Sequence, residues 1–350
     1  MASKRRIAYY AIHPMNYCLF RPVHRRLAGD GRIEFEFTGQ DGSCRKPVEM
    51  YRKAGLQGGR VVHTMRMRLA KYDMFIACNF RSLPWRARWK VQTYHGLSPV
   101  NSFLKKPHRI MKYDRLFLYG PHMKNRLVET GVLPEDDPRL ALIGWPKLDA
   151  LVDGSLDREA ILAGCGLDPK RKTVLYAPGW KKKGSLPTAG EQIARSLSEI
   201  GLNILVKLHD RSRDPGWSGC DWGRRLAGLQ LSNLSLAPGF DIVPYMFAAD
   251  MMLTDVSSVS YEYCVLDRPI VIFETPRALD HYPDMDQAVW KQDHGEVVHD
   301  ARAVRAAVEK GLASPEERSD IRRWKAGQLY YRPGTATDRA VAAIYEMLEL

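Results

Sequence analysis

The stretch Ala249–Tyr263, which reads ADMMLTDVSSVSYEY, contains the basic unit of the fold. Its apolar run Met251–Thr254 predicts a hydrophobic strand that stops at Asp255, and Val259–Leu266 has the spacing of a helix. A second apolar run, Pro269–Phe273, follows this helix. Strand, helix and strand in succession predict the β-α-β unit from which parallel sheets are built.

The same alternation continues on both sides of this unit. We expect further strands at Ile7–Ile12, Ile33–Thr38, Met74–Cys78, Val91–Tyr94, Leu116–Tyr119, Thr173–Ala177, Asn203–Leu208 and Leu234–Leu236. No G-x-G-x-x-G or P-loop pattern follows any of them. The sequence therefore predicts an α/β protein with two doubly wound, Rossmann-like domains that face each other across a cleft, where ligands bind at the carboxyl ends of the strands.

Charge divides the chain into two unlike parts. The 350 residues have a net charge of +13, with 53 Lys and Arg against 40 Asp and Glu. Residues 1–150 contain 28 Lys and Arg against 12 Asp and Glu, a net charge of +16, whereas the other 200 residues have a net charge of −3. A basic half attracts a polyanionic substrate, an anionic membrane surface or nucleic acid, and charge does not choose among them.

Composition also excludes several classes of protein. With 45% hydrophobic and 27% charged residues the chain is an ordinary globular protein. No window approaches the ~18 uncharged apolar residues of a membrane span, and we expect no signal peptide. The six cysteines lack a C-x-x-C pair, which indicates reduced thiols in the cytoplasm. We expect neither a metal nor another cofactor.

His95 follows the predicted strand Val91–Tyr94 and precedes Gly96, which lets a ligand approach the backbone closely. A histidine at the carboxyl end of a strand is suited to remove a proton from a hydroxyl group. The alternative is a histidine that only bonds a loop carbonyl.

Lys207 interrupts the apolar run of the strand Asn203–Leu208, and His209 follows it. A lysine in such a run is costly to bury unless an anion pairs with it, so an anionic ligand is its natural partner. His209 could then donate to developing negative charge at the same edge. The alternative is a structural Lys–Asp pair on an exposed strand end.

Ser257 and Ser258 lie where the helix after Asp255 begins. Unsatisfied amides and the positive end of a helix dipole make such a position a candidate phosphate site. The alternative is plain N-capping, for which serine and aspartate are preferred.

The turn Pro178-Gly179-Trp180 leaves another strand of the second half. It would present backbone amides to the ligand, and Trp180 could stack on a base. The alternative is a tryptophan used only for packing.

Five short motifs carry a resemblance: Thr93–Gly96, Tyr176–Trp180, Val206–His209, Leu253–Ser258 and Arg268–Val271. In this order and spacing, from about residue 90 to 275, they resemble the CDP-glycerol glycerophosphotransferase family, the polymerases and primases of wall teichoic acid and related capsule polymers. The resemblance implies a glycosyltransferase fold of the B type.

The resemblance assigns roles to the candidate residues and domains. It implies that the first domain holds the acceptor and the second binds the CDP-linked donor. The pattern loosens into Pro, Asp and Gly between residues 134 and 172, so we expect a basic acceptor-side domain at residues 1–155, a donor-binding domain at 156–335, and a C-terminal helix at 336–350 that packs back on the first domain. The resemblance makes His95 and His209 the catalytic residues. It places Lys207, Ser257 and Ser258 at donor-phosphate positions. From their positions after strands, we expect Asp255, Pro178, Gly179 and Trp180 to bind the donor as well.

The chain departs from the family's pattern at three places. Leu97–Pro99 stands where the family usually has Thr-Pro after His-Gly, and Asp210 stands where it usually has proline. Arg332–Arg339 resembles the family's closing segment, although Pro333 replaces an acidic residue. We expect these differences to affect which substrate the protein uses more than which reaction it catalyses.

We therefore expect a transferase that moves glycerol phosphate, or a related polyol phosphate, from a CDP-linked donor to a hydroxyl of a lipid-linked or polymeric acceptor and releases CMP. It would act in the cytoplasm, peripherally on the inner face of the cell membrane. One alternative is a nucleotide-sugar glycosyltransferase or epimerase of the same fold. A nucleic-acid-binding protein is the other, but no nucleic-acid motif is visible and we expect no such partner.

The segment from Phe80 to Lys90 interleaves aromatic residues and cations before His95. Its members Arg81, Trp85, Arg86, Arg88 and Trp89 predict a surface that contacts an anionic membrane and brings the acceptor to His95. The alternative is a basic loop whose tryptophans pack inward.

Overall fold

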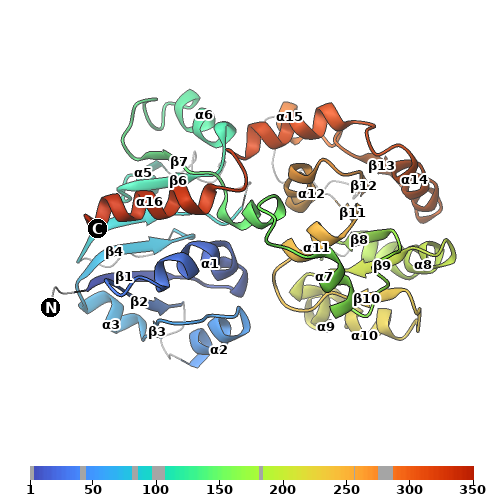
Figure 1. Ribbon diagram of the computed structural model, residues 1–350, viewed down its shortest axis with the longest axis horizontal. Coiled ribbons are helices and arrows are strands. Elements are labelled where there is room, and N and C mark those ends of the chain that lie inside the picture. The colour runs from blue at the N-terminus through green and yellow to red at the C-terminus, as the bar shows by residue number, and fades with distance from the viewer. Residues whose placement is uncertain are drawn as a thin grey trace. The chain divides into compact units, whose positions relative to one another are not determined.

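The computed structural model describes residues 4–39, 45–80, 86–96, 107–180, 184–255, 257–274 and 287–350. The chain forms two compact units (Figure 1). Unit 1 contains residues 1–149, 239–241 and 327–350, and unit 2 contains residues 150–238 and 242–326. The unit limits therefore fall at 149/150 and 326/327, where the sequence indicated 155/156 and 335/336.

Unit 1 contains a seven-stranded sheet in the order β3-β2-β1-β4-β5-β6-β7, with every described pairing parallel. Its elements are β1 (Arg5–Tyr10), α1 (Pro14–Ala28), β2 (Ile33–Thr38), α2 (Arg45–Lys53), β3 (Arg60–Val61), α3 (Thr64–Leu69), β4 (Tyr72–Ala77), β5 (Ala87–Gln92), α5 (Pro107–Ile110), β6 (Arg115–Leu118), α6 (Pro121–Glu129), β7 (Leu140–Leu142), the 3-10 turn η1 (Pro146–Leu151) and α16 (Ala336–Leu348).

Unit 2 contains a six-stranded sheet in the order β10-β9-β8-β11-β12-β13, again parallel throughout the described pairings. Its elements are α7 (Arg158–Gly164), β8 (Thr173–Ala177), α8 (Ser185–Glu199), β9 (Asn203–Val206), η2 (Asp210–Arg213), α9 (Pro215–Ser218), α10 (Trp222–Ala227), β10 (Leu234–Leu236), α11 (Val243–Ala248), β11 (Met251–Asp255), α12 (Ser258–Tyr263), η3 (Cys264–Leu266), β12 (Ile270–Phe273), α13 (Gln287–Trp290), β13 (Glu296–Val298), α14 (Ala301–Ala313) and α15 (Ser319–Leu329).

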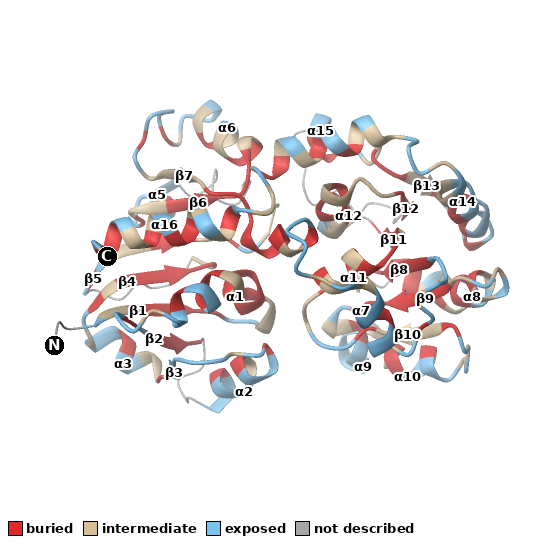
Figure 2. Cartoon of the chain, viewed as in Figure 1, coloured by how far each residue is buried: buried red, intermediate tan, exposed pale blue. Residues whose placement is uncertain are grey.

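The predicted fold class, two Rossmann-like domains with parallel sheets, is confirmed. Figure 2 shows the physical basis: strands are buried, and most helices have one buried and one exposed face. Several strands end one or two residues before the predicted position, and two of these ends lie beside candidate site residues. The strand predicted to reach Tyr94 ends at Gln92, because Tyr94 takes a positive φ of 56° that no strand allows. The strand predicted to reach Leu208 ends at Val206, so Lys207 lies in the loop that follows.

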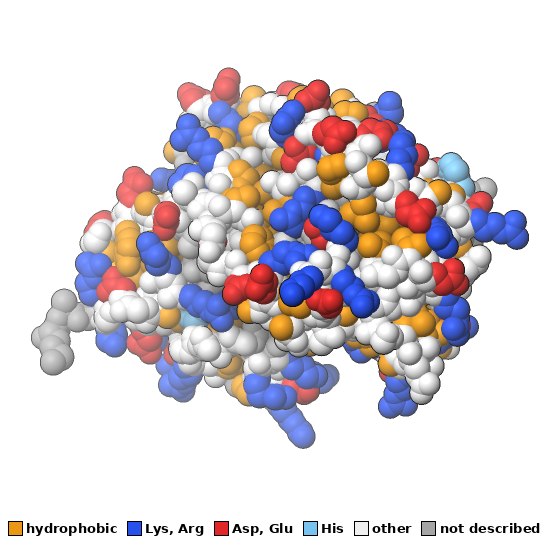
Figure 3. Space-filling view, turned by 45° about the vertical axis from the view of Figure 1, so that its right-hand side comes forward, with side chains coloured by type: hydrophobic (Ala, Val, Ile, Leu, Met, Phe, Trp, Pro, Cys, Tyr) orange, Lys and Arg blue, Asp and Glu red, His pale blue; other side chains and the backbone are white. Residues whose placement is uncertain are grey.

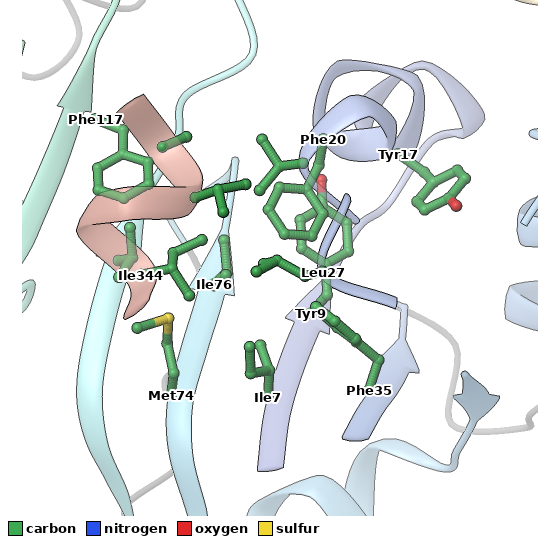
Figure 4. Packing of buried hydrophobic residues seen from close by; sticks show 14 of the residues in the cluster. Ile7, Tyr9, Tyr17, Phe20, Leu27, Phe35, Met74, Ile76, Phe117 and Ile344 are labelled. Carbon is green, nitrogen blue, oxygen red and sulfur yellow. The ribbon is translucent and has the colours of Figure 1, made fainter. Parts of the chain in front are cut away.

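The C-terminal helix α16 completes the core of unit 1. Its residues Ala340, Val341, Ile344, Met347 and Leu348 are buried in one cluster with side chains of β1, β4, β5 and β6. Figure 4 shows Ile344 beside Ile76 and Phe117, with Ile7 and Tyr9 in the same layer.

A buried carboxylate holds the start of α16. Asp149 accepts hydrogen bonds from the backbone N–H groups of Gly334 (2.9 Å), Ala336 (3.0 Å) and Thr337 (2.6 Å). These amides would otherwise be unsatisfied at the helix N-terminus. Arg339 adds hydrogen bonds to the carbonyl groups of Ile143 and Tyr331. The closing segment Arg332–Arg339 thus docks the helix on unit 1.

No helix in the described part of the chain combines the length and apolarity that crossing a membrane requires.

His24 lies in the core of unit 1 and is fully buried. Its ring packs edge-on against Phe35 and Phe37, and its Nδ1 is 2.9 Å from the Tyr17 hydroxyl. Burial lowers the pKa of His24 to about 4, with the neighbouring Arg25 acting in the same direction. Folding therefore favours the neutral ring.

We predict that unfolding becomes easier as the pH falls below 6.5, the ordinary pKa of histidine, because the unfolded chain then binds a proton that folded His24 accepts only near pH 4. One histidine with this pKa shift lowers the free energy of unfolding by about 2 kcal/mol when the pH falls from 7 to 5. Urea unfolding of the wild type and of His24→Phe at both pH values measures how much of the pH dependence comes from His24.

The control is His108→Gln, which changes an exposed histidine and should leave the pH dependence unaltered. Equal pH dependence in the wild type and His24→Phe would contradict the prediction.

Candidate functional site

Each sheet reverses its direction of winding at one point. In unit 1 the reversal lies between β1 and β4, and in unit 2 it lies between β8 and β11. Loops at the carboxyl ends of parallel strands meet at one edge, and ligands of such folds bind there. The predicted residues His95, His209, Lys207, Asp255 and Gly179 all follow or end strands at these edges.

His95 lies three residues past the end of β5, and its side chain is exposed. Its Nδ1 is 2.8 Å from the backbone carbonyl of Cys78, which follows the neighbouring strand β4. A carbonyl oxygen only accepts hydrogen bonds, so Nδ1 carries the hydrogen and Nε2 carries the lone pair. His95 therefore presents a basic nitrogen away from the backbone, as a general base requires.

The residue before His95 is held in a strained backbone conformation. Tyr94 is fully buried and has a φ of 56°, a region that costs a bulky residue about 1–3 kcal/mol. Its N–H donates to the Gln92 side chain (3.0 Å), and the carbonyl of Thr93 accepts from the Tyr119 hydroxyl (2.8 Å). These contacts stabilise the sharp turn that directs His95 away from the strand.

His209 has the opposite tautomer. It is the N-cap of η2, and its Nδ1 accepts a hydrogen bond of 3.1 Å from the backbone N–H of Arg211. Nδ1 must then carry the lone pair and Nε2 the hydrogen. His209 is thus arranged to donate a hydrogen bond from Nε2, and protonation of Nδ1 would break its cap.

Trp180 connects His209 to two residues that the sequence analysis missed. Its ring lies 6.0 Å from the His209 ring and 5.9 Å from the Trp217 ring, centroid to centroid. The Arg211 guanidinium lies 4.3 Å from the Trp180 ring centre, so it covers a ring surface on which a base was predicted to stack. Sequence alone offered only the motif His-Asp-Arg after β9 as a signal.

Asp255 is buried at the end of β11 and joins it to the loop after β8. Its carboxylate accepts hydrogen bonds from the backbone N–H groups of Gly179 (2.9 Å) and Ser185 (3.2 and 3.3 Å). A Cβ at Gly179 would lie 3.0 Å from the same carboxylate, so glycine permits this close approach. The carboxylate thus holds the turn that bears Pro178 and Trp180 and the start of α8.

Burial raises the pKa of Asp255, and the hydrogen bonds from Ser185 and Gly179 oppose this shift. A raised carboxyl pKa means that the contribution of Asp255 to stability is most favourable below about pH 4 and declines as pH rises through the folded-state value. At neutral pH its ionisation therefore costs folding free energy, which indicates that this carboxylate serves the geometry of the loop.

Ser257 and Ser258 differ in what their hydroxyls do. Ser257 caps α12, with its Oγ 3.5 Å from the N–H of Val259, so the capping alternative describes this hydroxyl. Ser258, the first residue of α12, is exposed. The Ser257 carbonyl accepts from the Ser260 hydroxyl, which in turn accepts from Nε2 of buried His294 (3.0 Å).

Lys207 is 8% exposed directly beyond β9, and its backbone N–H bonds the carbonyl of Tyr176 on β8. The structure thus brings Lys207, His209, Trp180, Ser258 and Asp255 to the same edge of the unit 2 sheet.

The predicted membrane segment is placed differently from the expectation. Arg86 precedes β5, and Arg88 and Trp89 lie in its first half, about 10–13 Å of strand before the end that leads to His95. Trp89 packs against the core, as in the inward-packing alternative, and Arg88 pairs with Glu349 at the surface. Arg81 and Trp85 lie outside the described residues.

Cations are also dispersed on the surface. Figure 3 shows Lys and Arg side chains mixed with Asp and Glu over the face that it draws, rather than one uninterrupted basic patch. Among the described residues, no group of three or more His, Cys, Asp or Glu side chains is placed to hold a metal ion.

Comparison with known proteins gives a family match over most of the chain. Residues 91–346 match the family described as CDP-glycerol:poly(glycerophosphate) glycerophosphotransferase. The matched range includes every candidate residue from His95 to Ser258 that the structure places at a sheet edge.

Curated relatives are enzymes of teichoic acid synthesis. The chain is 25% identical over 202 residues to the teichoic acid glycerol-phosphate primase of Bacillus spizizenii, which covers 54% of this chain and 49% of the relative. It is 24% identical over 209 residues to the teichoic acid poly(glycerol phosphate) polymerase of Staphylococcus epidermidis, covering 52% and 28%. The chain thus spans half or less of the length of these relatives.

Solved structures show the same fold. The wall teichoic acid polymerase TagF superposes with a TM-score of 0.71 at 15% identity, covering 99% of this chain and 90% of that one. The UDP-GlcNAc 2-epimerase of Neisseria meningitidis gives 0.61 at 13% identity, with 99% of both chains covered.

We predict that Asp255→Asn loosens the loop after β8, because an amide offers one acceptor oxygen and turns an NH₂ group toward a backbone N–H. Loss of a hydrogen bond to a buried charge costs ~1.5–3 kcal/mol, so the amides of Gly179 and Ser185 should exchange hydrogen ~10- to 100-fold faster. Hydrogen exchange resolved by residue measures this.

Asp250→Asn is a matched control. Asp250 accepts from the backbone N–H of Thr173 (2.9 Å) at the opposite end of the same two strands. Asp250→Asn should leave the amide hydrogen exchange of Gly179 and Ser185 unchanged. Unaltered exchange in Asp255→Asn would show that the loop does not depend on this carboxylate.

Proposed function

The chain belongs to the CDP-glycerol:poly(glycerophosphate) glycerophosphotransferase family, and from this premise we propose that it transfers glycerol phosphate from CDP-glycerol to a hydroxyl of a lipid-linked or polymeric teichoic-acid-like acceptor. The observation that carries the proposal is the pair of opposite histidine tautomers. His95 offers a lone pair on Nε2, and His209 offers a hydrogen on Nε2. Transfer to a hydroxyl needs one group of each kind.

In the proposed reaction, Nε2 of His95 takes the proton of the acceptor hydroxyl. The hydroxyl oxygen forms a bond to the phosphorus that bears the glycerol, and the bond from this phosphorus to the oxygen of CMP breaks. Negative charge grows on the phosphoryl oxygens and on the leaving CMP, so fixed donors accelerate the step.

The donors assigned to this charge come from unit 2. Nε2–H of His209 and the Lys207 ammonium are proposed to contact the donor phosphates, with the exposed Ser258 hydroxyl and the backbone of the Pro178–Trp180 turn beside them. Asp255 acts as a positioning residue in this scheme, since its carboxylate bonds Gly179 and Ser185.

We also propose that the acceptor is reached at an anionic membrane surface. The net charge of +16 over residues 1–150 supports this, because each cation near such a surface contributes ~1 kcal/mol. Since Trp89 packs inward, the exposed cations rather than this tryptophan would make the contact.

The first test is His95→Asn, in which the amide N–H can still bond the Cys78 carbonyl while the basic Nε2 is lost. CMP release from CDP-glycerol with a glycerol-phosphate polymer as acceptor should fall ~10²- to 10⁴-fold, with donor affinity nearly unchanged. His63→Asn is the control, because His63 caps α3 at the edge of the same sheet, four strands from β5.

Retention of more than about a third of wild-type turnover in His95→Asn would exclude the base role. Turnover of UDP-sugars without CMP release by the wild type would favour the nucleotide-sugar enzyme instead.

The second test concerns the donor site. Lys207→Ala and Ser258→Ala should each weaken CDP-glycerol binding by ~1.5–3 kcal/mol in calorimetry, because each removes a hydrogen bond to a charged group. Lys172→Ala is the control, since Lys172 pairs with Asp250 at the amino end of the strands. Wild-type affinity in both variants would place the donor elsewhere.

A further inference from the structure

Arg211 lies in a corner formed by two tryptophan rings. Its guanidinium carbon is 4.3 Å from the centre of the Trp180 ring and 4.2 Å from that of Trp217. The two rings are nearly perpendicular, at 88°. Two aromatic surfaces therefore restrict the guanidinium, although Trp217 is 50% exposed and the cluster lies at the surface.

The charge of Arg211 is not compensated by a carboxylate among the described residues. Arg225 shows the usual arrangement in the same unit: its guanidinium lies 4.7 Å from the Trp222 ring centre and also forms an ion pair with Glu191. Arg211 makes the ring contacts without an ion pair inside the described ranges. Its N–H groups are therefore available to an anion.

The position of Arg211 connects it to the catalytic edge. It is the second residue of η2, and its backbone N–H is the group that sets the tautomer of His209. Both side chains contact the Trp180 ring.

We propose that Arg211 is a phosphate-binding residue of the substrate site, and that Trp180 and Trp217 hold its guanidinium in place for this purpose. A guanidinium binds phosphate oxygens through its edge, with two parallel hydrogen bonds. Side-chain freedom already restricted by the rings does not have to be lost on binding. The identity of the phosphate rests on the proposed function: it belongs either to the CDP-linked donor or to a glycerol-phosphate polymer.

Calorimetry with CMP and with inorganic pyrophosphate tests the site directly. Arg211→Ala should weaken at least one of these probes about tenfold or more. Arg225→Ala, the matched control, removes an arginine that also lies on a tryptophan and should leave both affinities unchanged. Wild-type affinities for both probes in Arg211→Ala, together with unchanged KM values for donor and acceptor, would overturn the proposal.

Trp217→Leu separates positioning from charge. It keeps Arg211 but removes one wall of the corner, so phosphate affinity should fall by a smaller factor than in Arg211→Ala, and Trp217→Phe should restore most of it. A purely structural role would instead lower the melting temperature of Arg211→Ala and Trp217→Leu without changing affinity, and would contradict the proposal.

Steady-state kinetics then distinguish the two sources of phosphate. A raised KM for CDP-glycerol in Arg211→Ala assigns the donor, and a raised KM for the polymer assigns the acceptor. If the wild type binds pyrophosphate through Arg211 but turns over no CDP-glycerol, the proposed function fails while the phosphate site stands.

Discussion

The hydrogen bonds that Asp255 accepts from the backbone of Gly179 and Ser185 join the two strands at which the sheet of unit 2 reverses its winding. The turn held in this way carries Trp180, and Trp180 contacts both His209 and Arg211. One buried carboxylate thus orders, through the main chain, side chains that come from two other strands. Its charge lowers stability at neutral pH, as the direction of its pKa shows. An asparagine amide in its place would turn an NH₂ group toward a backbone N–H, so the cost is linked to the geometry.

Backbone groups also set the chemical difference between the two histidines. A carbonyl accepts from Nδ1 of His95, whereas an amide donates to Nδ1 of His209. The same ring therefore offers a lone pair in unit 1 and a hydrogen in unit 2. Because the main chain does not titrate, this assignment holds for as long as the neutral rings and the local turns persist.

Much of this architecture could be predicted from the sequence. The alternation of apolar runs and helices revealed both parallel sheets, and residues that follow strands formed the candidate site, because the period and length of such runs reflect burial. Local backbone conformation was not visible: nothing in the letters around Tyr94 indicates a left-handed residue that ends β5 early. Contacts between loops were equally hidden, which is why Trp217 was missed. The aromatic and basic pattern near Trp89 suggested a surface, yet the side chain is partly buried against the core, since successive residues of a strand point to opposite faces of the sheet.

Unit 1 combines segments that are synthesised at very different times. Its first strands precede unit 2 in the chain, whereas α16, which docks on Asp149, follows unit 2. β1 begins at Arg5, but the core it helps to form also contains Ile344 and Met347. As the chain leaves the ribosome, all of unit 2 emerges before the helix that closes unit 1. The first strands therefore lack part of their apolar core until more than three hundred further residues have been translated. Unit 1 therefore reaches its final packing only after residue 348 has been translated.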